Sequence, residues 1–276
     1  MREVTPAEDI AALFELGRQF WITGAIGSLV SVFLGAYFAY LMSSYTERRK
    51  RIVAETIALN RATTTVLSYF NTTTNLKRQI VIPKKAELDN FTQSFENHNT
   101  AASTTKQTIL ELKQKHLFLK ITKIEFLLGS ATRDVSALST ISGRPTLMAI
   151  ELDRSAATLN EIIAEHNSVM TELMLLSNQE ERLYKMLGLY NGRGLTDARF
   201  RATIEHMASV TDDILFFSSK IHDDITKHHL NWRKSVGAKS GTVLKLDFED
   251  DFSSLIPSAE NYSDWNNMPV VELREI

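Results

Sequence analysis

The chain has no cysteine among its 276 residues. Disulfide bonds, thiolate nucleophiles and cysteine-ligated zinc are therefore excluded. Glycine and proline are also scarce, with 11 and 5 residues, which favours long helices over a fold with many tight turns. The formal net charge is only -2, which argues against a domain that binds nucleic acid mainly through phosphate contacts.

Sequence motifs of catalysis are missing as well. The chain has no glycine-rich phosphate loop, no Gly-x-Ser-x-Gly elbow and no His-Glu-x-x-His pair. Glu161, Glu165 and His166 do not form the Glu-x-x-His pattern of di-iron bundles. We therefore expect no cofactor and favour a role other than catalysis, although the sequence does not exclude an enzyme.

The most prominent feature that is present is an uncharged apolar run, Phe20 to Met42. As a helix it would extend about 35 Å, enough to cross a hydrocarbon core of about 30 Å. The run predicts a single membrane-spanning helix. A cleaved signal peptide is the alternative, but the preceding segment is acidic and the run is longer than a signal-peptide core.

Basic residues directly after the run predict its orientation. Lys and Arg concentrate on the cytoplasmic side of a span, so we expect the N-terminus outside and the C-terminal domain in the cytoplasm, at an inner or plasma membrane. An exported sensor bundle with reversed topology is the alternative that this cluster disfavours. The cluster is also predicted to contact lipid head groups, and it consists of Arg48, Arg49, Lys50 and Arg51.

Small residues recur at helical spacing inside the run. Residues four apart share one helix face, where two backbones can approach closely. The stripe predicts a homo-oligomer, although small residues are also common in membrane helices that do not associate. The oligomerisation residues are Gly24, Gly27, Ser28, Ser31, Gly35 and Ala39.

The predicted fold class is all-α. A single N-terminal transmembrane helix would continue into a stalk, followed by an antiparallel bundle of about three long helices and a short irregular acidic tail. The expected parts are an N-terminal amphipathic segment (1–19), the transmembrane helix (20–44), a basic stalk helix (45–82), the helical bundle (83–236) and the acidic tail (237–276).

Periodicity predicts where the helices lie. The stalk has a weakly apolar seam, which favours a solvated, marginal helix ending at Pro83 over a hydrated oligomer axis or a specified register. The seam consists of Val53, Ile57, Asn60, Thr64, Leu67, Asn71 and Thr74. Apolar residues at steps of three and four then predict a helix over 110–139, a helix of about 45 residues after Pro145, and a last helix over 196–235.

The acidic tail has two interpretations that composition cannot separate. It could bind a partner in extended form, or it could pack on its own bundle or be disordered. A short strand-like alternation occurs near residue 246. The candidate partner-binding residues are Leu244, Leu246, Phe248 and Trp265.

One pair on the last helix is a candidate metal site. Asp224 and His228 are four residues apart and would share a helix face. Glu165 and His166 are possible further ligands for a membrane-tethered, metal-dependent hydrolase. Two ligands on one helix do not complete a coordination sphere, and a buried histidine is the ordinary explanation.

The sequence thus leads to two functional hypotheses. The first is a membrane-anchored helical interaction or assembly protein, a scaffold, sensor or effector, which self-associates through its span and bundle. It would bind membrane lipid, and a protein partner through the bundle or the acidic tail, but not nucleic acid. The alternative is the metal-dependent hydrolase.

Overall fold

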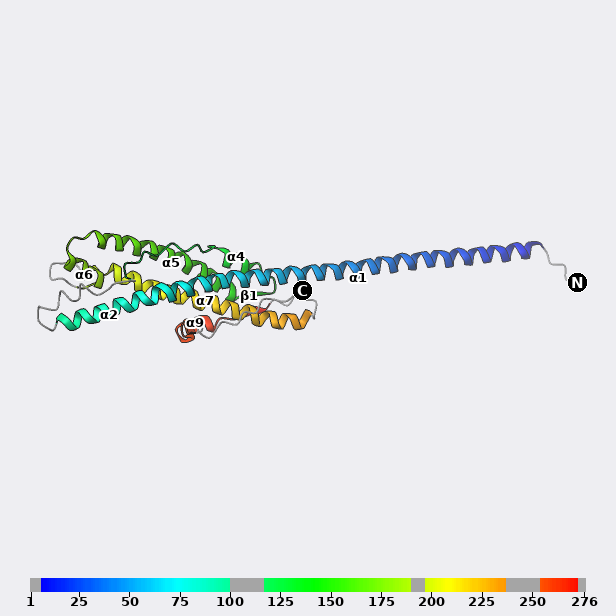
Figure 1. The fold of residues 1–276 in the computed structure, drawn as a ribbon. Helices are drawn as coiled ribbons and strands as arrows, with labels where there is room; N and C mark the ends of the chain where they lie inside the picture. Colours follow the sequence, from blue (N-terminus) through cyan, green and yellow to red (C-terminus); the bar gives the residue numbers. More distant parts are fainter. Residues whose placement is uncertain (1–5, 100–116, 190–196, 237–253, 273–276) are drawn as a thin grey trace. The chain divides into compact units, whose positions relative to one another are not determined.

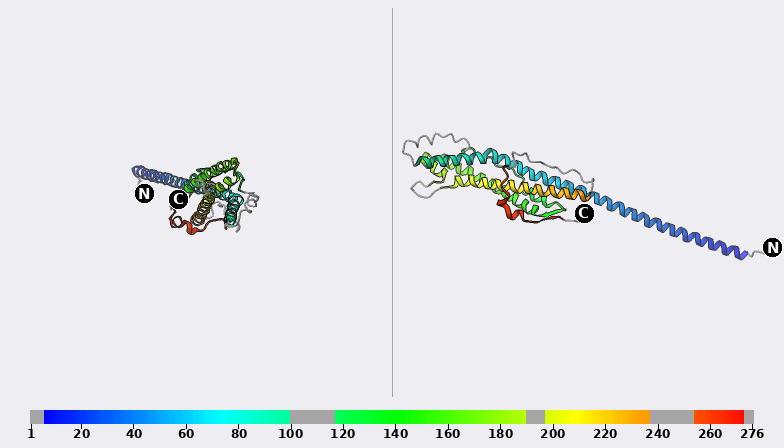
Figure 2. Two further views of the ribbon diagram at one scale, coloured as in Figure 1. Left: turned by 90° about the vertical axis from the view of Figure 1, so that its left-hand side faces the viewer. Right: turned by 90° about the horizontal axis from the view of Figure 1, so that it is seen from below.

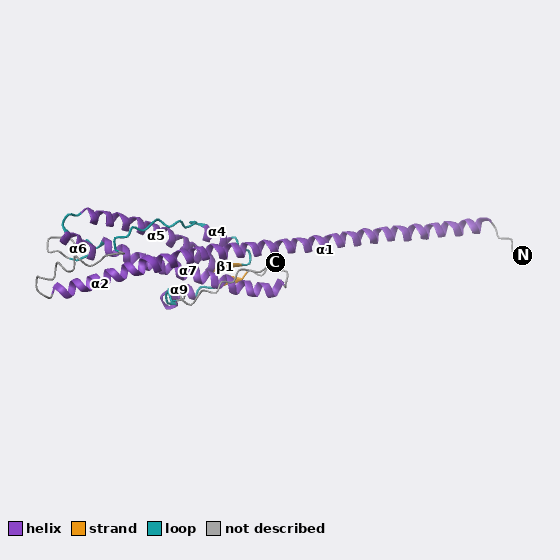
Figure 3. Ribbon diagram, viewed as in Figure 1, coloured by secondary structure: helices purple, strands orange, loops and turns teal. Residues whose placement is uncertain are grey.

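The computed structural model describes residues 6–99, 117–189, 197–236 and 254–272 (Figure 1). It is mostly helical with very little sheet, which confirms the all-α class (Figure 3). The chain divides into two compact units, residues 1–53 with residue 276, and residues 54–275. We describe each unit by itself.

Helix α1 (Pro6–Leu76) begins in the first unit and includes the whole predicted span. Pro6 opens it, at a position where the missing N–H costs nothing. Of the span's side chains, those of residues 20–23, 25–27 and 29–30 lie outside the described residues. Within the part of the chain whose side chains are described, no helix is both long and apolar enough to cross a membrane, so the structure does not support this prediction.

In the second unit, helical structure continues beyond the point where Pro83 was predicted to end it. A π-helical turn, η1 (Lys77–Val81), links α1 to α2 (Ile82–Asn99). The Ile82 N–H donates to the Lys77 carbonyl, five residues back. This wide turn accommodates the proline ring, and the missing N–H of Pro83 falls in the first turn of α2.

The predicted stalk seam is buried only in part. Val53 and Ile57 are exposed, whereas Leu67 and Thr74 are buried. Most of the buried side chains lie on an adjacent face of α1 that packs within the second unit. That face is not solvated, and it contributes Leu59, Ala62, Val66, Tyr69 and Phe70 to the core.

The predicted helix over 110–139 is also wrong in its described part. Residues 117–129 contain no helix, and α4 covers only Ser130–Ser136. Two asparagines of α5 hold the non-helical segment. Asn167 bonds both the N–H and the carbonyl of Ile121 at 3.0 and 2.7 Å, and Asn160 does the same for Ile124 at 3.0 Å. These amides replace the backbone partners that a helix would supply.

The predicted 45-residue helix is two helices, α5 (Arg144–Leu175) and α6 (Gln179–Leu187). Asn178 separates them because its side chain accepts the N–H groups of Glu180 and Glu181 and so starts a new helix. Helix α7 (Arg199–Val236) confirms the predicted last helix.

The core of the second unit lies between α5 and α7, with the end of α1 and α2 packed beside them (Figure 2). The two apolar stripes predicted for α5 and α7 are confirmed as core. Their fully buried members include Leu152, Leu159, Ile163, Ile204, Met207, Ile214 and Ile221.

The described part of the tail packs on this bundle. It contains η3 (Ala259–Tyr262), α9 (Ser263–Asn266) and β2 (Val270–Glu272). Strand β2 pairs antiparallel with β1 (Ile141–Gly143), with Ser142 opposite Val271. The strand-like stretch predicted near residue 246 lies outside the described residues.

Candidate functional site

The candidate site of the first unit is a sector of α1 with exposed large apolar side chains, Val32–Tyr45. Every residue from 31 to 50 is exposed, and Phe33 and Tyr40 expose 73% and 69% of their surface. Successive helix residues are about 100° apart, so the apolar side chains cover all sides of the helix rather than one stripe. We call residues 32–45 the apolar sector.

The four predicted lipid-contacting residues follow the apolar sector directly. Arg48, Arg49, Lys50 and Arg51 are all exposed. Because they are consecutive on a helix, their charges surround most of its circumference and form a basic collar.

The predicted oligomerisation stripe lies on the same helix. Ser28, Ser31 and Ala39 are exposed. Among the described residues, no atom outside the local helix lies within 4 Å of a Cβ placed on Gly24 or Gly35. The side chain of Gly27 lies outside the described residues.

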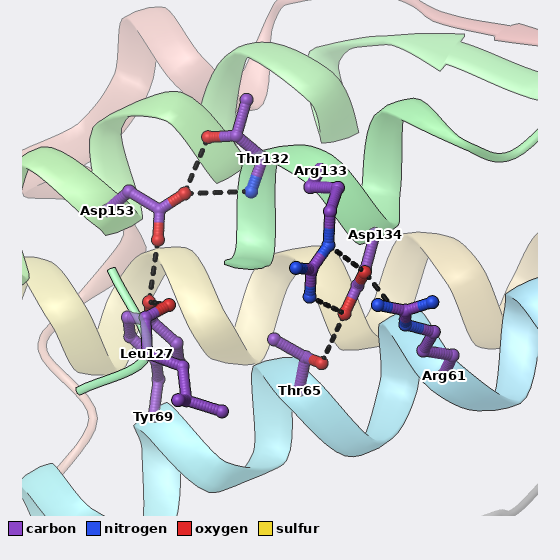
Figure 4. A network of polar contacts seen from close by, with 8 residues as sticks. All are labelled: Arg61, Thr65, Tyr69, Leu127, Thr132, Arg133, Asp134 and Asp153. Carbon is purple, nitrogen blue, oxygen red and sulfur yellow. Dashed lines mark hydrogen bonds and ion pairs between the residues drawn. The ribbon is translucent and has the colours of Figure 1, made fainter. Parts of the chain in front are cut away.

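In the second unit, the first polar cluster is centred on Asp134 of α4 (Figure 4). This buried carboxylate accepts the Thr65 hydroxyl at 2.7 Å and pairs with the Nε atoms of Arg61 and Arg133, both at 2.9 Å. Burial opposes ionisation of Asp134, but the hydrogen bonds from Arg133 and Thr65 hold its pKa below the ordinary value. The cluster ties α4 to α1.

Asp153 of α5 forms the second half of the same network (Figure 4). Its carboxylate accepts the Tyr69 hydroxyl at 2.6 Å and both the N–H and hydroxyl of Thr132 at 2.8 and 2.6 Å. Burial, reinforced by the bond to Asp153, raises the pKa of Tyr69. The phenol therefore acts as a hydrogen-bond donor that links α1 to α5.

Glu55 of α1 makes a further junction, with the chain just before β1. Its two carboxylate oxygens accept the N–H and hydroxyl groups of Ser139 and of Thr140, at 2.5 to 3.1 Å. Because the Thr140 hydroxyl donates its proton to Glu55, its oxygen accepts a hydrogen bond from the Nε2–H group of His228, at 2.7 Å.

The predicted metal pair does not converge. His228 bonds to Thr140, whereas the Asp224 carboxylate is held by Nε and Nη2 of Arg144 at 2.8 and 2.6 Å. Glu165 is exposed on α5, away from the buried His166. The described residues contain no group of three His, Asp or Glu side chains that could hold a metal ion, so the metal hypothesis gains no support.

His166 instead belongs to a buried polar cluster with Lys84. The Thr203 hydroxyl donates its proton to the Phe200 carbonyl, so its oxygen accepts a hydrogen bond from Nδ1–H of His166, at 2.9 Å. The other ring nitrogen, Nε2, then carries no proton and accepts a hydrogen bond from Lys84, at 3.3 Å. Lys84 also donates to the Leu117 carbonyl at 2.9 Å. Burial lowers the pKa of Lys84 to about 8 and, together with the Lys84 charge, that of His166 to about 3.

The predicted partner-binding residues of the tail fall in two groups. Leu244, Leu246 and Phe248 lie outside the described residues. Trp265 packs its ring edge-on against Phe217 of α7, with centroids 5.1 Å apart.

Sequence reasoning missed Glu55, Asp134 and Arg144. A usable signal existed for Glu55, since it precedes Leu59 and Ala62 at helical spacing and is therefore a charge on an apolar face. For Arg144, the only signal was its place between Gly143 and Pro145 at a helix start, which does not indicate its partner.

Comparison with known proteins adds no relative, because no family model, no curated protein and no solved structure matches the chain. The function must therefore be argued from the site itself. The polar clusters of the second unit hold Glu55, Asp134, Asp153 and Asp224 with protein donors, which is the arrangement of structural junctions. Among the residues that the structure describes, the apolar sector has no such explanation, because its side chains are all exposed.

The pKa of His166 makes the stability of the bundle depend on pH. In the folded state its imidazole stays neutral down to about pH 3, whereas in the unfolded chain it binds a proton below about pH 6.5. Acidification therefore favours the unfolded state. Between pH 7 and 5, wild-type protein should lose about 2 kcal/mol more unfolding free energy than His166→Gln, which cannot titrate.

Denaturant unfolding of the full chain in detergent, followed by circular dichroism, measures this difference. His206→Gln is the matched control, because it removes an exposed histidine from α7, the helix that carries Thr203. Parallel profiles for wild type and His166→Gln would contradict the assignment.

Proposed function

We propose that this chain is a single-pass membrane protein whose helical bundle binds and assembles with other proteins, as a scaffold, sensor or effector. Copies of the chain associate through the anchor. The N-terminus lies outside and the bundle lies in the cytoplasm, at an inner or plasma membrane. The observation that carries the proposal is the apolar sector of α1.

A helix that is apolar on all sides needs an apolar environment on all sides. Val32, Phe33 and Leu34 are consecutive and all more than half exposed. Since they project about 100° apart, a single helix packed against α1 would leave at least one of them in water. Lipid hydrocarbon covers every side at once.

The neighbouring sequence supports the same environment. The uncharged run begins at Phe20, before the apolar sector, and as a helix it is long enough for a hydrocarbon core. The basic collar, Arg48–Arg51, follows on the side that we assign to the cytoplasm, where it can contact anionic head groups.

Self-association is supported by the open small-residue stripe. Among the described residues, nothing occupies the space beside Gly24 and Gly35 that another backbone would need, and close backbone approach is how small residues promote helix pairing in lipid. The resulting clustering would bring several bundles together.

The anchor is tested by introducing charge into the apolar sector. The double variant Phe33→Arg/Leu34→Arg should leave the membrane fraction, because an arginine deep in a span costs about 2.5–3.5 kcal/mol. The measurement is the fraction of full-length protein that pellets with membranes after alkaline carbonate extraction.

Val53→Arg/Ile57→Arg is the matched control, since these two residues are also exposed and apolar on α1 but lie beyond the collar. This control should stay in the pellet. If the sector variant pellets as well as the control, the apolar sector is not inserted in the membrane.

Orientation can be measured because the chain has no cysteine, so that any introduced thiol is unique. On intact cells, a membrane-impermeant maleimide should label Thr5→Cys and should label Ser254→Cys only after lysis. The opposite pattern would place the bundle outside and the basic collar on the wrong side of the span.

Self-association is tested by filling the small-residue stripe. Gly27→Leu/Gly35→Leu should convert an oligomer into a monomer, because the added side chains separate the backbones. The mass of the full-length protein in nanodiscs provides the measurement, with Ala25→Leu/Ala36→Leu as a control that adds similar bulk on the opposite side of the helix. An oligomer that survives the stripe variant would place assembly elsewhere in the chain.

A further inference from the structure

The described end of the chain, residues 254–272, crosses three parts of the bundle (Figure 1, orange to red). We call it the strap. At the start of the strap, the Leu255 carbonyl accepts a hydrogen bond from Lys77 Nζ of η1 at 2.7 Å. The middle of the strap contacts α7, and β2 at its end pairs with β1. We call the surface that it covers the strap seat.

Two aromatic side chains anchor the middle of the strap. The Tyr262 ring stacks on Phe216 with centroids 3.8 Å apart, and its hydroxyl donates to Asp213 at 2.7 Å. Trp265 contacts Phe217 edge-on. Phe216 and Phe217 are buried, at 4% and 5% exposed.

The rest of the seat recognises the main chain of the strap. Arg144 donates from Nη1 to the Asn266 carbonyl at 2.9 Å and from its own backbone N–H to the Pro269 carbonyl at 3.1 Å. Gly143 has φ of 78°, and a Cβ there would lie 2.9 Å from the Pro269 oxygen. The seat therefore combines strand addition with two aromatic anchors, a common mode of peptide recognition.

The strap can leave without taking any part of the core with it. None of its residues from 254 to 271 is buried. Its regular elements are only three or four residues long, too short to be stable alone. The strap thus has the properties of a bound peptide that happens to be covalently attached.

We propose that the strap seat is an exchangeable peptide site, and that in the assembled protein its occupant is the strap of a neighbouring copy. This inference rests on the proposed self-association, which would hold copies at a high local concentration. Every contact in the seat is available to a neighbour's strap because the two sequences are identical. Residues 237–253, which connect α7 to the strap, can bridge at most about 60 Å.

Disulfide trapping distinguishes exchange from attachment within one chain. Ser142 and Val271 are directly opposite each other in the β1–β2 pair, where Cα atoms are about 4.5–5.5 Å apart and within reach of a disulfide. Two differently tagged full-length chains, one with Ser142→Cys and one with Val271→Cys, are co-expressed and their membranes oxidised. The expected result is a disulfide-linked dimer that carries both tags.

Three further chains make the result decisive. The double variant Ser142→Cys/Val271→Cys tests whether the two positions are opposite each other. It forms an internal disulfide where the strap occupies the seat of its own chain, and a linked dimer where it occupies that of a neighbour. As the control, a chain with Ser258→Cys is co-expressed with the Ser142→Cys chain in place of the Val271→Cys chain. Ser258 is exposed in the strap but does not lie opposite β1. Ser31→Cys, in the span, reports self-association independently of the strap.

A mixed dimer with Val271→Cys but not with Ser258→Cys supports the exchange. An internal disulfide in the double variant without any mixed dimer, while Ser31→Cys still cross-links, overturns the exchange and leaves the proposed function intact. Failure of both the mixed dimer and the Ser31→Cys dimer overturns both.

A second readout tests recognition by the aromatic anchors. Adding Trp265→Ala to the Val271→Cys chain should lower the yield of mixed dimer about tenfold, as loss of an aromatic anchor does at peptide interfaces. Glu260→Ala, an exposed change in the same strap, should leave it unchanged. Equal yields for the two variants would overturn seat-specific exchange.

Discussion

The ion pair between Arg144 and Asp224 joins the start of α5, helix α7 and the strap, and the geometry of this end of the bundle depends on it. Both side chains are largely buried, and two guanidinium nitrogens meet the two carboxylate oxygens. Such a pair adds little net stability, but losing one partner leaves a buried charge and costs roughly 3–5 kcal/mol. Its main effect is therefore to fix geometry. It locks the start of α5 against α7 and aims Nη1 of Arg144 at the strap.

The other buried carboxylates extend this principle along the bundle. Glu55, Asp134 and Asp153 each accept hydrogen bonds from a segment other than their own, and together they fix the second half of α1 against α4, α5 and the chain just before β1. A buried carboxylate requires donors at defined positions, whereas apolar contacts tolerate sliding. These polar junctions therefore select one register among the many that apolar stripes alone would allow.

The parts of the fold that could be predicted from sequence are those that depend on local periodicity. The stripe of α7 and most of that of α5 were readable because apolar residues recur every three or four positions. The break at Asn178 and the non-helical segment 117–129 were not, since the break depends on the bonds of one asparagine side chain and the segment on those of two, Asn160 and Asn167. In residues 117–129, helix-like spacing of apolar residues was outweighed by amides on α5, a tertiary effect that no local pattern encodes.

The same distinction holds for the candidate sites. An uncharged run and a basic cluster can be recognised in one stretch of sequence, so the apolar sector and the collar were predictable. The roles of Asp224 and His228 were not, because their partners, Arg144 and Thr140, are far away in the chain. Proximity on one helix suggested a shared ligand, but each side chain already had a protein donor or acceptor to satisfy.

The distribution of these contacts indicates where the second unit could change state. Rearranging α1, α5 and α7 would break several buried polar junctions at once, each of which leaves unpaired groups behind. Detaching the strap breaks side-chain bonds that are only partly buried, such as those of Leu255, Tyr262 and Asn266, and uncovers two phenylalanines. The low-stability end of a structure is where exchange with partners occurs. A bundle built in this way can keep its core fixed while its strap changes partners.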